Sequence, residues 1–286
     1  MANDIDSRAG QVVPGEYRTE RLAPLSAVAP ENLFTVRGLK FAYGDHVIFD
    51  GLDLTLHEGV ITTLIGANGS GKTTLFNLMT KQLRPMAGDV FLRRGNIAYI
   101  GLRDFARLVS IVHQRNTVPA DLSVAKLVGY GREPYHGLGQ VAATEEDDAM
   151  VAWALDVCDL RAFADKPVSS LSGGQSQRAW IAMALAQGAR VLLLDEPTTY
   201  LDVRYQLDIL RLVRRLNREY GLTVIMVLHD INQSLYYSDE VVALAKGRIV
   251  AQGAPDQVVA PDLIREVYGI DLDIAQVNGK PFVLGV

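Results

Sequence analysis

The sequence of 286 residues has little cysteine and no long hydrophobic run. Cys158 is its single cysteine, so no internal disulfide can form, which is typical of a protein in a reducing compartment. A helix that spans a bilayer needs about 20 apolar residues in succession, and the sequence has no such run. Residues 1–4 do not begin the charged and then apolar pattern of a secretory signal. We therefore expect a soluble, cytosolic protein.

The sequence also lacks an excess of basic residues. Lysine and arginine number 28, against 33 aspartates and glutamates, which gives a net charge of −5. Because nucleic acids bind to basic surfaces, we expect no nucleic-acid partner. Arginines scattered along one amphipathic helix are more typical of a solvated face than of a nucleic-acid site. These are Arg204, Arg211, Arg214, Arg215 and Arg218.

Composition divides the chain into a short tail and a large domain. Hydrophobic residues make up 49% of the sequence, enough to bury a core and to exclude global disorder. Residues 1–32 contain three prolines, mixed charges and no apolar period, so we expect a disordered tail. A regulatory or partner-binding arm is the alternative. In residues 33–286 strand and helix patterns alternate, which predicts an α/β domain with a helical insertion at about residues 115–164.

Apolar spacing locates several strands. Leu52, Leu54 and Leu56 alternate with polar residues, which predicts a half-buried strand. Three short apolar runs are typical of buried strands in a largely parallel sheet, and they cover residues 60–65, 191–194 and 222–228. Two further strands flank the Lys246-Gly247 pair, which favours a hairpin.

Helices are predicted by capping residues and by the 3.6-residue period. One helix should run from Lys72 to about Leu83. Thr144 and Asp147 resemble a capping box at the start of a second helix, within the insertion. A third helix is indicated by apolar residues that share one face, namely Ile209, Leu212, Val213, Leu216 and Tyr220.

A glycine-rich loop follows the first buried strand. Residues 66–73 read GANGSGKT and match the pattern G-x-x-x-x-G-K-[ST], in which glycines let backbone N–H groups surround a phosphate. Lys72 would contact the β- and γ-phosphates, and the Thr73 hydroxyl would ligate Mg²⁺. The strand and helix around the loop disfavour an incidental glycine turn. The expected nucleotide-binding residues here are Gly66, Ala67, Asn68, Gly69, Ser70, Gly71, Lys72, Thr73 and Thr74.

Asp195 and Glu196 end the second buried strand. Open α/β sheets bind ligands at the carboxyl ends of their strands, so this pair is well placed for chemistry. Asp195 would hold Mg²⁺ through its water shell, and Glu196 would orient or deprotonate the water that attacks the γ-phosphate. Solvated acids are common at strand ends, so the assignment depends on the pairing with the glycine-rich loop.

Leu171-Ser172-Gly173-Gly174-Gln175 precedes an alanine-rich helix. A hydroxyl, two glycines and a helix N-terminus suit an anion, although an isolated segment of this kind is also typical of an ordinary N-cap turn. Together with the glycine-rich loop and Asp195-Glu196 it closely resembles the nucleotide-binding subunit of ABC transporters. The resemblance covers roughly residues 33–284 and rests on seven ordered motifs. It implies a P-loop NTPase-type α/β fold, a mostly parallel sheet with an antiparallel β part and a helical insertion.

The resemblance gives roles to four further residues. Tyr43 looks like the aromatic residue that stacks on adenine, although a ring packed on the core is the alternative. Gln114 resembles the glutamine that contacts Mg²⁺ and the attacking water, and His229 resembles the histidine that holds the γ-phosphate. Asp202 lies in a segment similar to the loop that crosses the dimer interface. The catalytic residues implied are Glu196, His229, Gln114 and Lys72.

The resemblance also implies an assembly. Two copies would close head-to-tail on two ATP molecules as a homodimer, and Ser172, Gly173, Gly174 and Gln175 of one copy would complete the phosphate site of the other. The helical insertion would dock an integral membrane permease, which places the chain at the cytoplasmic face of the cell membrane, with a substrate-binding protein as an indirect partner. Two positions depart from the usual pattern, His113 before Gln114 and Tyr200 before Leu201.

Three segments and a terminal hairpin resemble one branch of this family, the importers of iron–siderophore complexes. The segments are residues 131–136, 198–202 and 261–269, and the hairpin turns at Asn278-Gly279. Residues 131–136 by themselves are also typical of a plain surface loop. We expect an ATPase that drives ferric siderophore uptake, with haem, cobalamin or another metal chelate as alternative cargo.

Two other classes remain as alternatives. A non-transport ABC ATPase that acts on DNA or ribosomes would usually carry a coiled-coil insertion or two nucleotide domains, and the sequence has neither. A regulatory module that holds ATP without turnover often lacks a residue equivalent to Glu196 or His229, and both are present here.

Overall fold

The computed structural model describes residues 31–114, 116–117, 119, 121–137, 143–277 and 279–285. Residues 1–30, most of the expected tail, lie outside the described residues, as does Asn278 of the expected hairpin turn. The chain forms two compact units. We call residues 101–223 the helical unit, and residues 31–100 together with 224–285 the sheet unit. The boundaries predicted at residue 32 and at residues 115–164 stay predictions.

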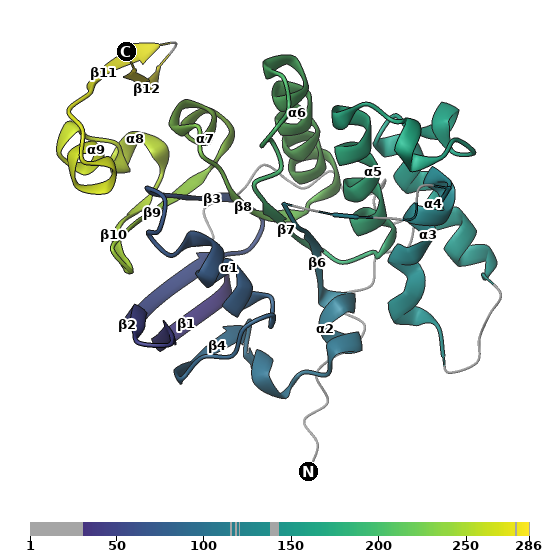
Figure 1. Ribbon diagram of the computed structural model, residues 1–286, viewed down its shortest axis with the longest axis horizontal. Helices are drawn as coiled ribbons and strands as arrows, with labels where there is room; N and C mark the ends of the chain where they lie inside the picture. The colour runs from purple at the N-terminus through teal and green to yellow at the C-terminus, as the bar shows by residue number, and fades with distance from the viewer. Residues whose placement is uncertain are drawn as a thin grey trace. The chain divides into compact units, whose positions relative to one another are not determined.

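An antiparallel sheet forms the first part of the sheet unit, with the strand order β2-β1-β4-β5 (Figure 1). The alternation predicted at Leu52, Leu54 and Leu56 is confirmed, because all three side chains are buried. Val36 of β1 pairs with Leu54 of β2, and both are buried, so the two strands supply apolar side chains to the same core. The strands are β1 (Asn32–Tyr43), β2 (His46–His57), β4 (Ala87–Leu92) and β5 (Gly95–Asn96), and the 3-10 helix η2 (Ile97–Tyr99) follows.

A mostly parallel arrangement forms the second part of the sheet unit, in the order β10-β9-β3-β8. The central strand β3 runs parallel to both β8 and β9, and every residue of β3 is buried, which accounts for its continuous apolar run. The hairpin predicted at Lys246-Gly247 joins β9 to β10 as expected. The strands are β3 (Ile61–Ile65), β8 (Thr223–Val227), β9 (Glu240–Ala245) and β10 (Arg248–Gly253).

Helix α1 (Lys72–Met79) follows β3 and is shorter than predicted. The expected end near Leu83 is wrong, because the chain leaves the helix at Thr80. The Thr80 hydroxyl donates to the Phe76 carbonyl at 2.9 Å, and Lys81 takes a left-handed φ of 62° that no helix can continue. The apolar Leu83 therefore lies in the connection to β4.

The C-terminal part of the sheet unit packs on β3 and β9 (Figure 1). Ile65 of β3, Leu235 of α7, Ile264 of α9 and Val283 of β12 share one buried cluster. The hairpin strands expected around residue 278 are confirmed, because β11 and β12 pair antiparallel. The elements are α7 (Ile231–Tyr237), α8 (Pro255–Val258), α9 (Pro261–Tyr268), β11 (Asp273–Val277) and β12 (Lys280–Leu284).

The helical unit holds two parallel strands and a set of packed helices. Strands β6 (Val109–Val112) and β7 (Val191–Asp195) pair in register, and α3, α4 and α5 pack against one another (Figure 1). The α-helices are α2 (Leu102–Leu108), α3 (Val124–Gly129), α4 (Glu145–Val157), α5 (Gly173–Ala186) and α6 (Val203–Tyr220). The 3-10 helices are η3 (Tyr130–Tyr135), η4 (Arg161–Phe163) and η5 (Val168–Ser170).

Two helix predictions in this unit are confirmed. Thr144 and Asp147 form the expected capping box at the start of α4, each side chain accepting from the backbone of the other. The apolar face of α6 is buried from Ile209 to Leu216, while Tyr220 is half-buried and meets the Trp153 ring edge-on at 5.6 Å. Among the described residues, no helix combines the length and the apolar character that crossing a membrane requires.

Candidate functional site

The glycine-rich loop connects β3 to α1, and its glycines are required by backbone geometry. Gly66, Gly69 and Gly71 take left-handed φ angles of 154°, 78° and 108°. A Cβ on Gly66 would lie 2.4 Å from the Leu244 carbonyl oxygen, and a Cβ on Gly71 would lie 2.8 Å from the Phe49 ring. The loop is therefore held tightly against β9 and β2, and no larger residue fits at either position.

Lys72 folds back over this loop. Its side chain is buried, and its ammonium group donates to the carbonyl oxygens of Gly66 at 2.7 Å and Ala67 at 3.0 Å. No side chain caps the N-terminus of α1 at Gly71. The Ser70 hydroxyl is buried without a hydrogen-bond partner among the described residues. An ammonium group, a helix N-terminus and an unsatisfied hydroxyl together suit a phosphate.

Tyr268, the last residue of α9, also contacts the loop. Burial raises the pKa of the Tyr268 phenol to about 12, although the hydrogen bond between its oxygen and the Gly66 backbone acts in the opposite direction. The sequence indicated this residue only through the resemblance of residues 261–269 to one family branch. Its contact with the phosphate loop was not predicted, because no local pattern links residues so distant in the chain.

Tyr43 and His229 lie at strand ends of the sheet unit. The Tyr43 ring is half-exposed at the end of β1 and meets the Phe41 ring edge-on, with the centroids 4.9 Å apart. The Tyr43 side chain is therefore not enclosed in the core. His229 is exposed just after β8, and the next residue, Asp230, caps α7 by accepting from the Gln233 backbone at 2.9 Å. The roles of Tyr43 and His229 stay predictions.

The helical unit carries the acidic pair. Asp195 is buried at the carboxyl end of β7, and Glu196 takes a left-handed φ of 50°, which is unusual for a residue with a side chain. This turn directs the Glu196 carboxylate to Gln114, whose Nε2 donates to Glu196 Oε2 at 2.5 Å. The Thr199 hydroxyl donates to the same oxygen at 3.1 Å. The structure thus brings together two predicted catalytic residues that lie 82 positions apart.

The segment Ser172–Gln175 begins α5 as a capping box. The Ser172 hydroxyl accepts from the Gln175 backbone at 3.3 Å, and the Gln175 side-chain oxygen accepts from the Ser172 backbone at 3.0 Å. The ordinary N-cap geometry that the sequence left open is therefore present. A Cβ on Gly174 would lie 2.6 Å from the Tyr205 ring of α6, so close helix packing explains this glycine. The role of the segment as an anion site stays a prediction.

The loop between β7 and α6 contains the expected interface residue. Asp202 is exposed at the N-cap position of α6 and makes no side-chain capping bond there. Tyr200, one of the departures from the family pattern, takes a left-handed φ of 67° and is 79% exposed. A large ring is thus presented on the surface beside Asp202.

Residues 131–136 do not form a plain surface loop, so that alternative is wrong. Arg132 is buried, and its guanidinium donates to Asp147 Oδ1 at 2.7 Å and to the Ala186 carbonyl at 3.1 Å. Its charge also lies 4.1 Å from the centre of the Tyr135 ring. A Cβ on Gly131 would lie 2.2 Å from the Met183 carbonyl oxygen. This segment therefore fastens the start of α4 to the end of α5.

Asp147 is the central acceptor of this cluster. Burial by itself would raise its pKa, but hydrogen bonds from Arg132, Thr144 and His136 outweigh burial and hold the pKa of Asp147 well below its ordinary value. The carboxylate therefore stays ionised at neutral pH and serves α4 as both capping residue and ion-pair partner.

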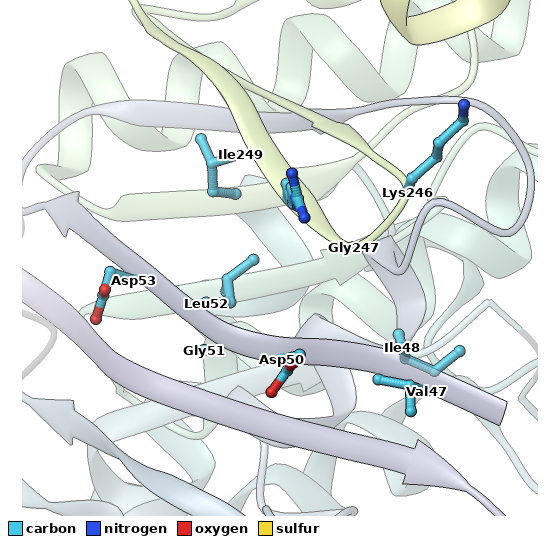
Figure 2. Close-up of a pocket in the computed structure, with 10 residues that line it drawn as sticks. Val47, Ile48, Asp50, Gly51, Leu52, Asp53, Lys246, Gly247 and Ile249 are labelled. Atoms are coloured by element: carbon cyan, nitrogen blue, oxygen red, sulfur yellow. The ribbon is translucent and has the colours of Figure 1, made fainter. Parts of the chain in front are cut away.

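A groove in the sheet unit contains none of the predicted site residues. It is formed by β2 and the β9–β10 hairpin, and Figure 2 shows the side chains of Asp50 and Asp53 on β2 and of Lys246 at the turn. Gly247 in its wall donates its backbone N–H to the Ser70 carbonyl at 3.1 Å. This bond shows that one wall of the groove contacts the phosphate loop. The groove is lined by both acidic and basic side chains, so its charge does not point to one class of ligand.

A buried strand, a phosphate loop and an acidic strand end define an α/β ATPase of the P-loop class. Residues 49–199 match the family model described as ABC transporter, and the chain belongs to that family. It is 43% identical to the iron(3+)-hydroxamate import ATP-binding protein FhuC of Bacillus subtilis (strain 168), over 85% of this chain and 90% of the relative. It is 40% identical to the ferric enterobactin transport ATP-binding protein FepC of Escherichia coli (strain K12), over 89% of this chain and 95% of that relative.

Solved structures agree with the family assignment. The chain resembles cbiO1 from Clostridium perfringens, part of the transporter complex cbiONQ, with a TM-score of 0.71 and 30% identity over 79% of this chain and 90% of that one. It also resembles a dimeric ATP-binding cassette in a post-hydrolysis state with ADP and Pi. The TM-score is 0.67, and the identity is 26% over 78% of this chain and 98% of that one. The expected α/β fold and the expected binding of ATP are confirmed. The chain is an ABC ATPase.

Proposed function

We propose that this chain is the ATP-hydrolysing subunit of an importer of ferric siderophores. The observation that carries the proposal is its 40–43% identity, over 85–89% of its length, to subunits named for import of ferric hydroxamate, petrobactin and enterobactin. Similarity over so much of the chain extends well beyond residues 49–199, the part that matches the family model. Haem, cobalamin and other metal chelates are the alternative cargo.

The sheet unit would hold the triphosphate. Lys72 now donates to two carbonyls of its own loop, and these bonds are exchangeable for bonds to the β- and γ-phosphates. The buried Ser70 hydroxyl would gain the partner it lacks among the described residues. Tyr43, half-exposed at the end of β1, would stack on the adenine ring, and His229 would donate to the γ-phosphate.

Mg²⁺ fits the donors that the sequence assigns to it. The Thr73 hydroxyl is exposed in the first turn of α1, Asp195 offers carboxylate oxygens, and Gln114 keeps its amide oxygen while its nitrogen bonds Glu196. All three are hard oxygen ligands of the kind that Mg²⁺ prefers. When bound, the cation would neutralise charge on the phosphate oxygens during transfer.

Glu196 would orient the attacking water and accept its proton. The Gln114 and Thr199 hydrogen bonds fix one carboxylate oxygen, so the other oxygen has a defined direction. Because Gln114 follows β6 and directly precedes residues 115–164, movement of that segment would disturb the Gln114–Glu196 bond. This bond offers a route by which a docked permease controls hydrolysis.

The active assembly would be a head-to-tail homodimer. Ser172 and Gln175 satisfy each other at the start of α5, and the same hydroxyl would turn to the γ-phosphate bound by the partner copy. The related dimeric cassette with ADP and Pi supports dimerisation. We further propose that the dimer lies at the cytoplasmic face of the membrane under a permease that receives cargo from a binding protein.

Reconstitution tests the proposal. The chain would be purified with the integral membrane protein it retains, placed in liposomes with the cognate binding protein, and assayed for ATP hydrolysis with a ferric hydroxamate siderophore. We expect stimulation by the ferric siderophore and none by the iron-free siderophore, haem or cobalamin. Stimulation by haem or cobalamin alone would assign the alternative cargo, and a preparation that retains no membrane protein would contradict the transport role.

A further inference from the structure

The terminal hairpin and helix α7 are joined by a pair of hydrogen bonds that nothing in the sequence motifs assigns. Asn232, in the first turn of α7, donates its side-chain amide to the Val283 carbonyl at 2.9 Å. Its side-chain oxygen accepts from the Val283 backbone N–H at 2.8 Å. The Asn232 side-chain amide therefore bonds both the N–H and the C=O group of Val283 on the edge of β12 that faces away from β11. A neighbouring strand would otherwise make these bonds.

Helix α7 is fixed on its other sides as well. Asp230 caps its start, and the Ser234 hydroxyl donates to the Asp230 carbonyl at 2.7 Å. At the other end, the hydroxyls of Ser238 and Thr63 lie 2.5 Å apart in the core, which ties α7 to β3. The helix therefore lies between the strand that leads into the phosphate loop and the terminal hairpin.

Hydrophobic contacts reinforce the link to the hairpin. Val283 and Leu235 are both 1% exposed and share the buried cluster that includes Ile65, the last residue of β3. Lys280 adds a contact at the hairpin turn, where its ammonium group donates to the Tyr236 carbonyl at 2.8 Å and lies 4.4 Å from the centre of the Tyr236 ring. The hairpin is therefore docked on α7 rather than attached loosely as a C-terminal extension.

His229 lies directly before the residue that caps α7. Its backbone connects the buried strand β8 to a helix that the Asn232–Val283 bonds hold against the terminal hairpin. We propose that the terminal hairpin β11–β12 is a positioning element for His229, and that Asn232 is the positioning residue through which it acts. The hairpin holds α7, α7 fixes the backbone after β8, and the His229 imidazole is thereby directed at the γ-phosphate. The inference rests on the proposed role of His229.

The substitution Asn232→Ala tests the inference in the full-length chain. It removes both hydrogen bonds and leaves the backbone N–H and C=O groups of Val283 without their Asn232 partner. We expect kcat for ATP hydrolysis to fall about five- to tenfold with KM for ATP unchanged, because the phosphate loop is untouched. The matched control is Asn217→Ala, which removes a buried side-chain bond to the Leu222 carbonyl at the end of α6. That control should lower the midpoint of thermal unfolding and leave kcat unchanged at 25 °C.

A double-variant cycle separates positioning from mere stabilisation. If Asn232 acts through His229, Asn232→Ala should produce no further loss of kcat in a His229→Ala background. Equal additional loss in both backgrounds, or wild-type kcat in the single variant Asn232→Ala, would overturn the inference. Wild-type kcat in His229→Ala alone would instead show that the proposed role of His229 is wrong.

Discussion

The Gln114 side-chain nitrogen donates to the Glu196 carboxylate at 2.5 Å, and this bond joins the segment after β6 to the turn after β7. The two strands are parallel neighbours, so the residues that follow them emerge at the same sheet edge. Glu196 reaches Gln114 because its backbone is left-handed, which turns its side chain away from the direction of the strand. The bond holds the proposed general base in one orientation.

Replacing Glu196 tests its proposed role. Glu196→Gln keeps the size of the side chain but removes the base, so hydrolysis should fall about 10²–10⁴-fold while ATP affinity is retained. Gel filtration with ATP should then show an accumulated dimer. The exposed Glu219 on α6 provides a control, since Glu219→Gln should hydrolyse ATP at the wild-type rate. If Glu196→Gln turns over normally, the assigned base is wrong.

Replacing Lys72 tests the phosphate loop. Lys72→Ala removes an ammonium group that would make charged hydrogen bonds to the phosphates, so the Kd for ATP should rise about tenfold to a hundredfold. A titration with a fluorescent ATP analogue measures this change. Lys126 on α3 is exposed, and Lys126→Ala should bind the analogue like the wild type. Equal affinity of Lys72→Ala and the wild type would refute the assignment.

Replacing Asp147 tests the cluster that it forms with Arg132, Thr144 and His136. Asp147→Asn removes the buried carboxylate partner of Arg132 and leaves only the exposed Glu146 as its ion-pair partner, so the free energy of unfolding at pH 7 should fall by about 3 kcal/mol. Urea denaturation measures this loss. Asp148, exposed on the adjacent position of α4, provides the control, because Asp148→Asn should change stability by less than about 0.5 kcal/mol.

The same cluster predicts a pH dependence. Because the pKa of Asp147 is lower in the folded chain than in the unfolded one, its contribution to stability is complete above the unfolded pKa of about 3.9. The contribution is lost as the pH falls below that value toward the folded pKa. The difference in unfolding free energy between the wild type and Asp147→Asn should therefore shrink as the pH falls from about 4 toward the folded pKa. A difference that grows as the pH falls below about 4 would contradict the assigned direction.

Cys158 should be inert in the native protein. Burial raises the pKa of its thiol to about 12, far above the ordinary value near 8.5, so almost no thiolate is present at pH 8. We expect no reaction with Ellman's reagent until the chain is unfolded in guanidinium chloride, after which one thiol per chain should react. Rapid labelling of the native protein would show that this part of the helical unit opens.

The sequence predicts the phosphate loop well because its structure is determined locally. A buried strand, glycines that must take positive φ and a helix start occur within residues 61–79, and the structure has each of them. The end of α1 was missed by several residues, since the left-handed backbone of Lys81 ends the helix and the apolar period does not report it.

Long-range contacts were not predictable in the same way. The Gln114–Glu196, Arg132–Asp147 and Asn232–Val283 bonds each join residues that only the folded topology brings together. The strand-end acidic pair gave Glu196 its role and the family resemblance gave Gln114 its role, but the resemblance did not indicate their mutual bond. It gave no role to Arg132 or Asn232, because buried polar contacts of this kind leave no periodic signal in one sequence.

The central claim is that each ATP lies between the phosphate loop of one copy and the Ser172–Gln175 segment of the other. Two inactive variants, Lys72→Ala and Ser172→Arg, test it when they are mixed. A head-to-tail heterodimer combines both substitutions at one site and leaves the second site intact. The account predicts that the mixture hydrolyses ATP although neither variant does so alone. If the mixture is as inactive as either variant while gel filtration shows that the variants associate, the claim is contradicted.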